Sequence, residues 1–242
     1  MVAPVTLAAR VAVVLTLAAG ALSACGIDGN PSGTSVATIG ESVPPSEGFT
    51  AVTEPRTGHL DDGTSWTVML PQVRGGDPHV RTAFNNEADA ILTRLTGQPS
   101  GNGQTIGDGS IGTAERSRTI VGDRTLSGVV IVLGNAKGAA YPSLRVATVV
   151  LDNQTGTVID DPFTDRSEAT KLLASRAAAH DPTGRLRDGA TYSSFTAWVP
   201  LPEGFHMYVE VPHVLGDYVQ VTLPWNEVTG LLKPDAAQLL VG

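Results

Sequence analysis

The run Val-Val-Ile-Val-Leu at residues 129–133 is the strongest indication of the fold that we expect of this chain. Every position in it is apolar, so a strand built from these residues would be apolar on both faces. Such a strand belongs inside a sheet that is covered on both sides. The run therefore predicts a central strand with one layer of structure packed above it and another below.

Neighbouring segments supply the partners of this strand. Alternating apolar residues or short apolar runs, bounded by turn residues, predict the other strands. We expect them around residues 65–70, 114–121, 126–133, 144–151, 194–199, 205–211 and 218–223. The glycine-rich stretch 97–112 is expected to be a mobile surface loop. It contains a G-x-G-x-x-G pattern at residues 107–112, but dinucleotide binding needs a strand before those glycines and a helix opening at them, and we expect neither.

Two main helices are predicted to pack on the sheet. The first begins at Asp77, which precedes a proline, and continues to Gly97 with apolar residues at spacings of three and four. The second covers about residues 167–180, where Asp165 and Glu168 are placed for a capping box. A short C-terminal helix is expected at 225–232. Because strands and helices do not alternate regularly, the fold class is α+β with a largely antiparallel sheet.

The N-terminal residues predict an exported protein. Arg10 precedes an apolar stretch that is shorter than the roughly 18 to 20 residues of a membrane span, which is typical of a signal peptide over residues 1–24. Residues 22–25, Leu-Ser-Ala-Cys, resemble the lipobox of bacterial lipoproteins. The resemblance implies that Cys25, the only cysteine, carries a diacylglyceryl anchor; the alternative is ordinary secretion with a free thiol. Residues 25–48 read as a flexible tether and residues 49–242 as one domain.

Composition and motifs argue against several classes of function. The net charge is −8, and it becomes −9 without Arg10, so nucleic acid is not an expected partner. The five histidines show no metal-binding spacing, and no G-x-S-x-G pattern is present. The acidic pairs 61–62 and 160–161 suggest glycoside cleavage, but both occupy turn-like sequence that favours Asp for local hydrogen bonds. We expect no catalytic residue, no cofactor and no metal.

The segment 205–211 offers a candidate recognition strand. Alternation places Phe205, Met207, Val209 and Val211 on a core face. His206, Tyr208 and Glu210 then lie on the other face, where the Tyr and His rings combine an apolar body with a polar tip. The competing interpretation is a solvated or helix-covered face with no binding role.

The longer segment SSFTAWVPLPEGFHMYVEVPHVLGDYVQVTLPWNEVTGLLKP, residues 193–234, resembles the C-terminal domain of the RsiV-like family. That family occurs in lysozyme-sensing anti-sigma factors and in a secreted mycobacterial immunogenic antigen, and the likeness extends over about residues 49–240. Its members often carry Gly-x-His-Pro where this chain has residues 138–142, so Tyr141 stands at the histidine position. The resemblance implies a ligand-binding ectodomain without established catalysis. The candidate binding residues are Tyr141, His206, Tyr208, Glu210 and Tyr218.

These features together predict a lipid-anchored, non-catalytic binding protein on the outer face of the cytoplasmic membrane. Its partners would be the membrane, through the anchor, and a protein or cell-wall glycan ligand. A cell-envelope hydrolase of glycan or peptidoglycan, or an accessory subunit of one, remains an alternative. A purely structural envelope lipoprotein is another.

Overall fold

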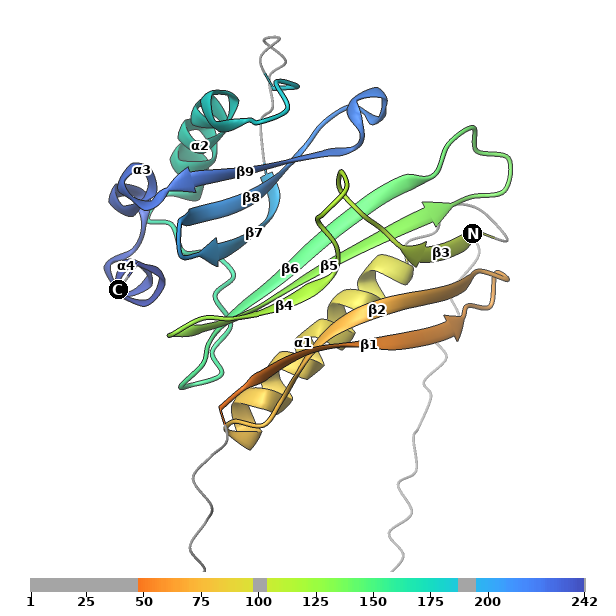
Figure 1. The fold of residues 1–242 in the computed structure, drawn as a ribbon, viewed down its shortest axis with the longest axis horizontal. Coiled ribbons are helices and arrows are strands. Elements are labelled where there is room, and N and C mark those ends of the chain that lie inside the picture. Colours follow the sequence, from red (N-terminus) through yellow and green to blue (C-terminus); the bar gives the residue numbers. More distant parts are fainter. Residues whose placement is uncertain (1–47, 98–103, 187–194, 242) are drawn as a thin grey trace, which may run out of the picture. The chain divides into compact units, whose positions relative to one another are not determined.

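The computed structural model describes residues 48–97, 104–186 and 195–241. The predicted signal peptide, Cys25 and nearly all of the predicted tether lie outside these residues. Within the described ranges the chain forms nine strands and four α-helices, and all but one of the strand pairs are antiparallel (Figure 1). The predicted α+β class is confirmed.

A six-stranded sheet is built around β5. Its strands are β1 (Thr50–His59), β2 (Ser65–Arg74), β3 (Thr105–Asp108), β4 (Arg118–Val121), β5 (Thr125–Asn135) and β6 (Ser143–Asp152). Strand β6 pairs with one edge of β5 along its length. Strands β3 and β4 share the other edge, β3 beside the end of β5 and β4 beside its beginning. Strand β2 joins β3 by the one parallel pairing, and β1 forms the outer edge.

The central run is covered on both sides, as its sequence predicts. Val130 and Val132 pack in the cluster that contains the apolar residues of α1 (Pro78–Thr96). Val129 and Ile131 belong to the other cluster, which joins this sheet to a second one. Gly128 allows α1 to approach closely, because a Cβ atom there would lie 3.0 Å from the ring of Phe84. Asp77 caps α1 as predicted, accepting hydrogen bonds from the first turn.

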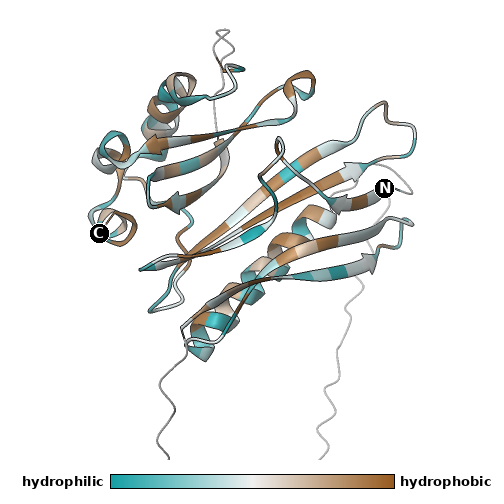
Figure 2. Ribbon diagram, in the orientation of Figure 1, coloured by the Kyte–Doolittle hydropathy of each residue, from teal (hydrophilic) through white to brown (hydrophobic). Residues whose placement is uncertain are grey.

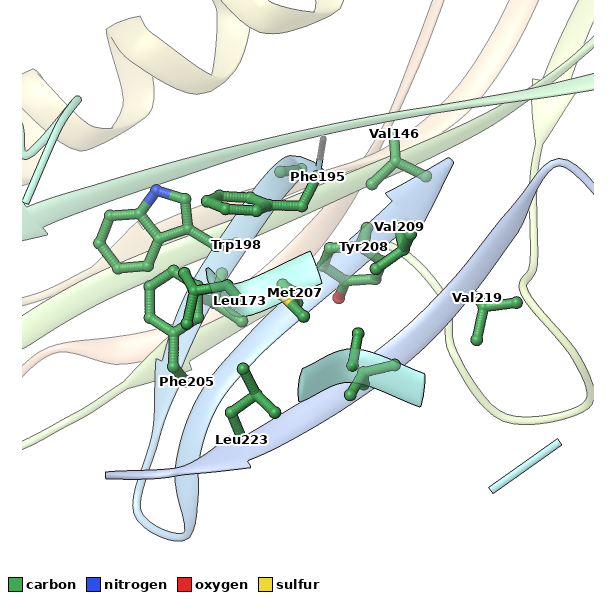
Figure 3. Packing of buried hydrophobic residues seen from close by; sticks show 14 of the residues in the cluster. Val146, Leu173, Phe195, Trp198, Phe205, Met207, Tyr208, Val209, Val219 and Leu223 are labelled. Atoms are coloured by element: carbon green, nitrogen blue, oxygen red, sulfur yellow. The ribbon is translucent and has the colours of Figure 1, made fainter. Parts of the chain in front are cut away.

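The second sheet and three helices form the rest of the domain. Strands β7 (Phe195–Leu201), β8 (Gly204–Glu210) and β9 (Tyr218–Pro224) pair antiparallel in that order. Figure 3 shows Leu173 of α2 (Arg166–His180) beside Phe205 and Met207 in their shared core. The ring of Trp198 stacks on Phe205 with centroids 5.0 Å apart. The helices α3 (Trp225–Val228) and α4 (Pro234–Leu240) follow β9.

Strand β1 was not predicted from the sequence, and two further elements differ from the prediction. The stretch expected as a surface loop contains β3, whose Ile106 is buried against the α1 side of the sheet. A strand therefore does precede the glycine pattern, but no helix opens at it, because residues 109–117 run on to β4 without helical structure. The second difference is α4. The expected helix at 225–232 is α3 with a following 3-10 turn, and α4 begins after it at Pro234.

The exposed edge strand β1 is mostly polar, and Figure 2 shows the contrast with the apolar central strands. Glu54 on β1 accepts hydrogen bonds from Arg56 at 2.9 Å and Arg74 at 3.0 Å. The two guanidinium groups lower the pKa of the Glu54 carboxyl. A charged strand containing Pro55 is a poor template for pairing with another chain.

Candidate functional site

The strand that the sequence proposed as a recognition face is buried on both sides. Phe205, Met207 and Val209 lie in the core as predicted, but His206 and Tyr208 are also buried, with exposed fractions of 7% and 0%. The segment Gly109–Ser117 between β3 and β4, which we call the strap, packs against Tyr208, because Glu115 of the strap accepts a hydrogen bond from the Tyr208 hydroxyl at 2.5 Å. The expectation of an open face with His206 and Tyr208 is therefore wrong.

Local sequence features hold the strap in place. The amide of Gly109 donates to the carbonyl of Ile131 at 3.0 Å, and a Cβ atom on Gly109 would lie 2.8 Å from side chains of Ile131 and Leu144. Ile111 is buried in the cluster between the two sheets. Arg118, at the start of β4, donates to the Glu115 carboxylate at 3.2 Å. Gly109 thus lets the strap approach β5 and β6 closely, and the buried side chain of Ile111 anchors the strap in the core.

Burial sets the protonation of this polar cluster. Desolvation raises the pKa of the Tyr208 phenol, and the nearby Glu115 carboxylate raises it further. Desolvation lowers the pKa of His206, which favours a neutral imidazole. The His206 Nδ1 lies 2.8 Å from the Thr222 hydroxyl, while its Nε2 has no hydrogen-bond partner among the described residues. The cluster is suited to holding the strap in place and offers no proton to a ligand at the surface.

The remaining candidates lie at one end of the domain, where two loops meet. Tyr141 is in the β5–β6 loop, and its side chain is 71% exposed. Its ring centroid lies 5.8 Å from that of His213 in the β8–β9 loop. Glu210 is exposed at the end of β8, and Tyr218 pairs with it across the start of β9 but is only 8% exposed. The structure thus pairs Glu210 with Tyr218 and places Tyr141 beside His213, while His206 and Tyr208 lie in the interior.

Asp217 joins the β8–β9 loop to the start of β6, directly after the β5–β6 loop. Its carboxylate accepts a hydrogen bond from the amide of Leu144 at 2.8 Å, and its other oxygen lies 2.7 Å from Nδ1 of His213. Its carbonyl accepts from the amide of Val211 at 2.8 Å. Asp217 has φ of 67°, the one positive value among the described non-glycine residues. Aspartate tolerates this left-handed conformation better than most residues, and the contacts on both sides hold it there.

We define the loop-tip surface as Tyr141, His213, Val214 and Asp217. Val214 is 89% exposed, so it and Tyr141 are the two most exposed large apolar side chains in the part of the chain that the structure describes. Sequence reasoning missed His213, Val214 and Asp217. The available signal was a valine within a short turn between Pro212 and Gly216, beside the leucine that packs against the core.

The loop-tip surface lies at the far end of the large sheet from the point where the described chain begins. Phe49 packs against Gly76, just before α1, and the first turn of α1 lies beside Gly156 in the segment after β6. The β5–β6 loop is at the other end of those strands (Figure 1). The 11 residues of β5 correspond to about 35 Å at roughly 3.3 Å per residue.

One aspartate of each acidic pair accepts a local hydrogen bond within a turn, as the sequence predicts. Asp62 accepts a hydrogen bond from the amide of Thr64 at 2.8 Å, and contacts with Thr64 lower the pKa of Asp62. Asp161 accepts a hydrogen bond from the amide of Phe163 at 3.2 Å.

Across residues 48–97, 104–186 and 195–241, no three His, Cys, Asp or Glu side chains gather as a metal site. In the same ranges, no helix combines the length and apolar character needed to span a membrane.

Comparison with known proteins shows a likeness of fold. No family model and no curated protein matches the chain. Among solved structures, it is similar to a DUF3298 family protein from Pseudomonas aeruginosa PAO1, with a TM-score of 0.50 and 11% sequence identity over 78% of this chain and 95% of that one. At this identity the likeness shows the fold alone.

Proposed function

We propose that this protein is a lipid-anchored, non-catalytic binding protein of the cell envelope, and that its loop-tip surface binds a partner protein. The observation that carries the proposal is the exposure of Tyr141 (71%) and Val214 (89%) on two loops that meet where the ring of Tyr141 lies beside that of His213. Exposed aromatic and aliphatic side chains on a pre-ordered surface are the usual centre of a protein interface.

The position of this surface supports the same role. It lies about 35 Å along β5 from the end where the chain enters the domain, by the usual rise of a strand. A domain tethered through Cys25 and residues 25–48 can then present the loop tips away from the membrane. The RsiV-like pattern in residues 193–234 and the DUF3298 fold are both consistent with a ligand-binding ectodomain. The net charge of −8 favours a basic partner.

The test measures binding to a basic protein and to a glycan. The chain is immobilised, and surface plasmon resonance follows binding of lysozyme and of purified cell-wall polysaccharide. We expect lysozyme to bind, with Kd raised at least about tenfold by Tyr141→Ala and by Val214→Ser, because each removes a central apolar contact. Val121→Ser is the matched control, since Val121 is 41% exposed at the β4–β5 turn, at the other end of β5.

Several results would contradict the proposal. Binding that Tyr141→Ala and Val214→Ser leave unchanged would exclude the loop-tip surface. Binding of polysaccharide alone would replace the protein partner by a glycan, and no binding of either probe would favour a structural lipoprotein. Glycan hydrolysis that is lost in the double variant Asp160→Asn with Asp161→Asn would show an enzyme. Mass spectrometry of the native protein tests the anchor, and we expect Cys25 at the N-terminus with a diacylglyceryl group.

A further inference from the structure

A groove at the other end of the domain offers a second site with a different chemistry. It lies among the β4–β5 turn, the segment that follows β6, and α4. Its volume is about 430 Å³, within the range of small-molecule sites. The loop-tip surface contributes nothing to it, so the two regions can be tested separately.

Hydrogen bonds fix the walls of this groove. The amide of Asn153 donates to the carbonyl of Arg124 at 3.0 Å, and the Asn153 side chain donates to the carbonyl of Asp123 at 2.9 Å. On the opposite wall, the amide of Lys233 donates to the carbonyl of Pro162 at 2.9 Å. The Lys233 ammonium donates to the carbonyl of Asp161 at 2.7 Å. The start of α4 is thereby tied to the segment after β6, and the groove is ordered without a ligand.

Three charged side chains of the groove, one cation and two carboxylates, have no hydrogen-bond or ion-pair partner among the described residues. The side chain of Arg124 forms no hydrogen bond or ion pair with any residue that the structure describes, and its Nε atom is buried. Asp160 and Asp235, which are exposed at the rim, likewise have no described partner. Opposite charges therefore line one groove without pairing. A guanidinium that has no protein partner is free to donate to an anionic group in the groove, and such a charge-assisted contact is strong.

The rest of the lining narrows the class of ligand. Val158, Ile159 and Leu239 supply half-buried apolar surface between the charged groups. None of the described residues that line this groove is aromatic, so it lacks the flat ring on which a sugar would stack. A ligand that matches the groove has an anionic group, a primary ammonium and a short aliphatic part.

We propose that this groove binds a small aliphatic zwitterion. Arg124 holds its carboxylate or phosphate, for which the planar guanidinium is well suited. Asp160 and Asp235 hold its primary ammonium. The same pair of charged groups occurs in a short peptide and in an ethanolamine phosphate headgroup. This site goes beyond the proposed function and does not depend on it.

Saturation-transfer NMR on the full chain in detergent tests the proposal. The probes are alanyl-alanine, its N-acetyl form, its C-terminal amide, and phosphoethanolamine. We expect saturable binding of alanyl-alanine, of phosphoethanolamine, or of both. If alanyl-alanine binds, the Kd of its N-acetyl form and that of its amide should each be at least about tenfold higher than the Kd of the free dipeptide. Tighter binding of alanyl-alanine identifies a peptide as the source of the ligand, and tighter binding of phosphoethanolamine identifies a lipid headgroup.

Variants then assign the contacts. Arg124→Gln should raise the Kd of the bound zwitterion about tenfold or more, while leaving that of the dipeptide amide unchanged. The double variant Asp160→Asn with Asp235→Asn should raise the Kd of the bound zwitterion and leave the Kd of the N-acetyl dipeptide unchanged. Arg116→Gln and Asp61→Asn, exposed residues outside the groove, are the controls and should change neither. The proposal is overturned if no probe binds saturably, if blocked and free dipeptides bind alike, or if Arg124→Gln changes nothing.

Discussion

The hydrogen bond between Tyr208 and Glu115 provides the sharpest test of why the predicted recognition strand is closed. Tyr208→Phe removes the hydroxyl and keeps the ring, so Glu115, whose exposed fraction is 9%, loses one of its donors in a buried setting. A hydrogen bond to a charged group contributes about 1.5 to 3 kcal/mol. Because Arg118 still donates to the same carboxylate, we expect the free energy of unfolding to fall by about 1.5 to 2.5 kcal/mol.

Urea unfolding, followed by tryptophan fluorescence and circular dichroism, measures this loss. With an m-value of about 2 kcal/mol per molar urea, the midpoint should fall by about 1 M. Tyr141→Phe is the matched control, because it removes the same hydroxyl from a side chain that is 71% exposed, and it should change stability by less than about 0.5 kcal/mol. A double-mutant cycle of Tyr208→Phe with Glu115→Ala should give a coupling energy of at least about 1 kcal/mol.

Two results would refute this reasoning. If Tyr208→Phe destabilised the domain no more than Tyr141→Phe, the buried hydrogen bond would not hold the strap. If the effects of Tyr208→Phe and Glu115→Ala were additive, the two side chains would act independently. In either case the burial of Tyr208 would need an explanation other than its contact with Glu115.

Two further predictions concern the small sheet. Burial lowers the pKa of His206 below its value in the unfolded chain, so the free energy of unfolding should be greatest above about pH 6.5 and fall as the pH decreases, by at most about 1.4 kcal/mol per pH unit. His206→Gln should flatten this pH dependence. Equal slopes for the two proteins would contradict the prediction. Gly204→Ala should cost about 1 to 3 kcal/mol in urea unfolding, because its Cβ would collide with the carbonyl of Leu223, whereas Gly230→Ala, with no atom within 4 Å of the new Cβ, should be nearly neutral. Equal midpoints for the two alanine variants would show that the sheet accommodates the methyl group.

The loop-tip surface shows why a site on loops is hard to find from one sequence. Tyr141 was singled out only through its place in a family pattern, and nothing local indicated that it would meet His213. The two residues are in loops separated by three strands and a helix, and Asp217 helps to bring them together by contacting both His213 and Leu144 at the start of β6. The groove was equally hidden, since Arg124 and Asp235 belong to segments far apart in the sequence.

Local sequence features are enough to predict the layers of the fold and the caps of its main helices. An apolar run at residues 129–133 requires cover on both faces, and Asp77 and Asp165 satisfy the amides of the helices that they precede, so both features follow from local chemistry. Which polar side chains reach the surface depends instead on contacts between segments that are distant in the sequence. Alternation along β8 separates its two faces but cannot show that the strap packs against Tyr208, because the strap lies some 90 residues earlier in the chain.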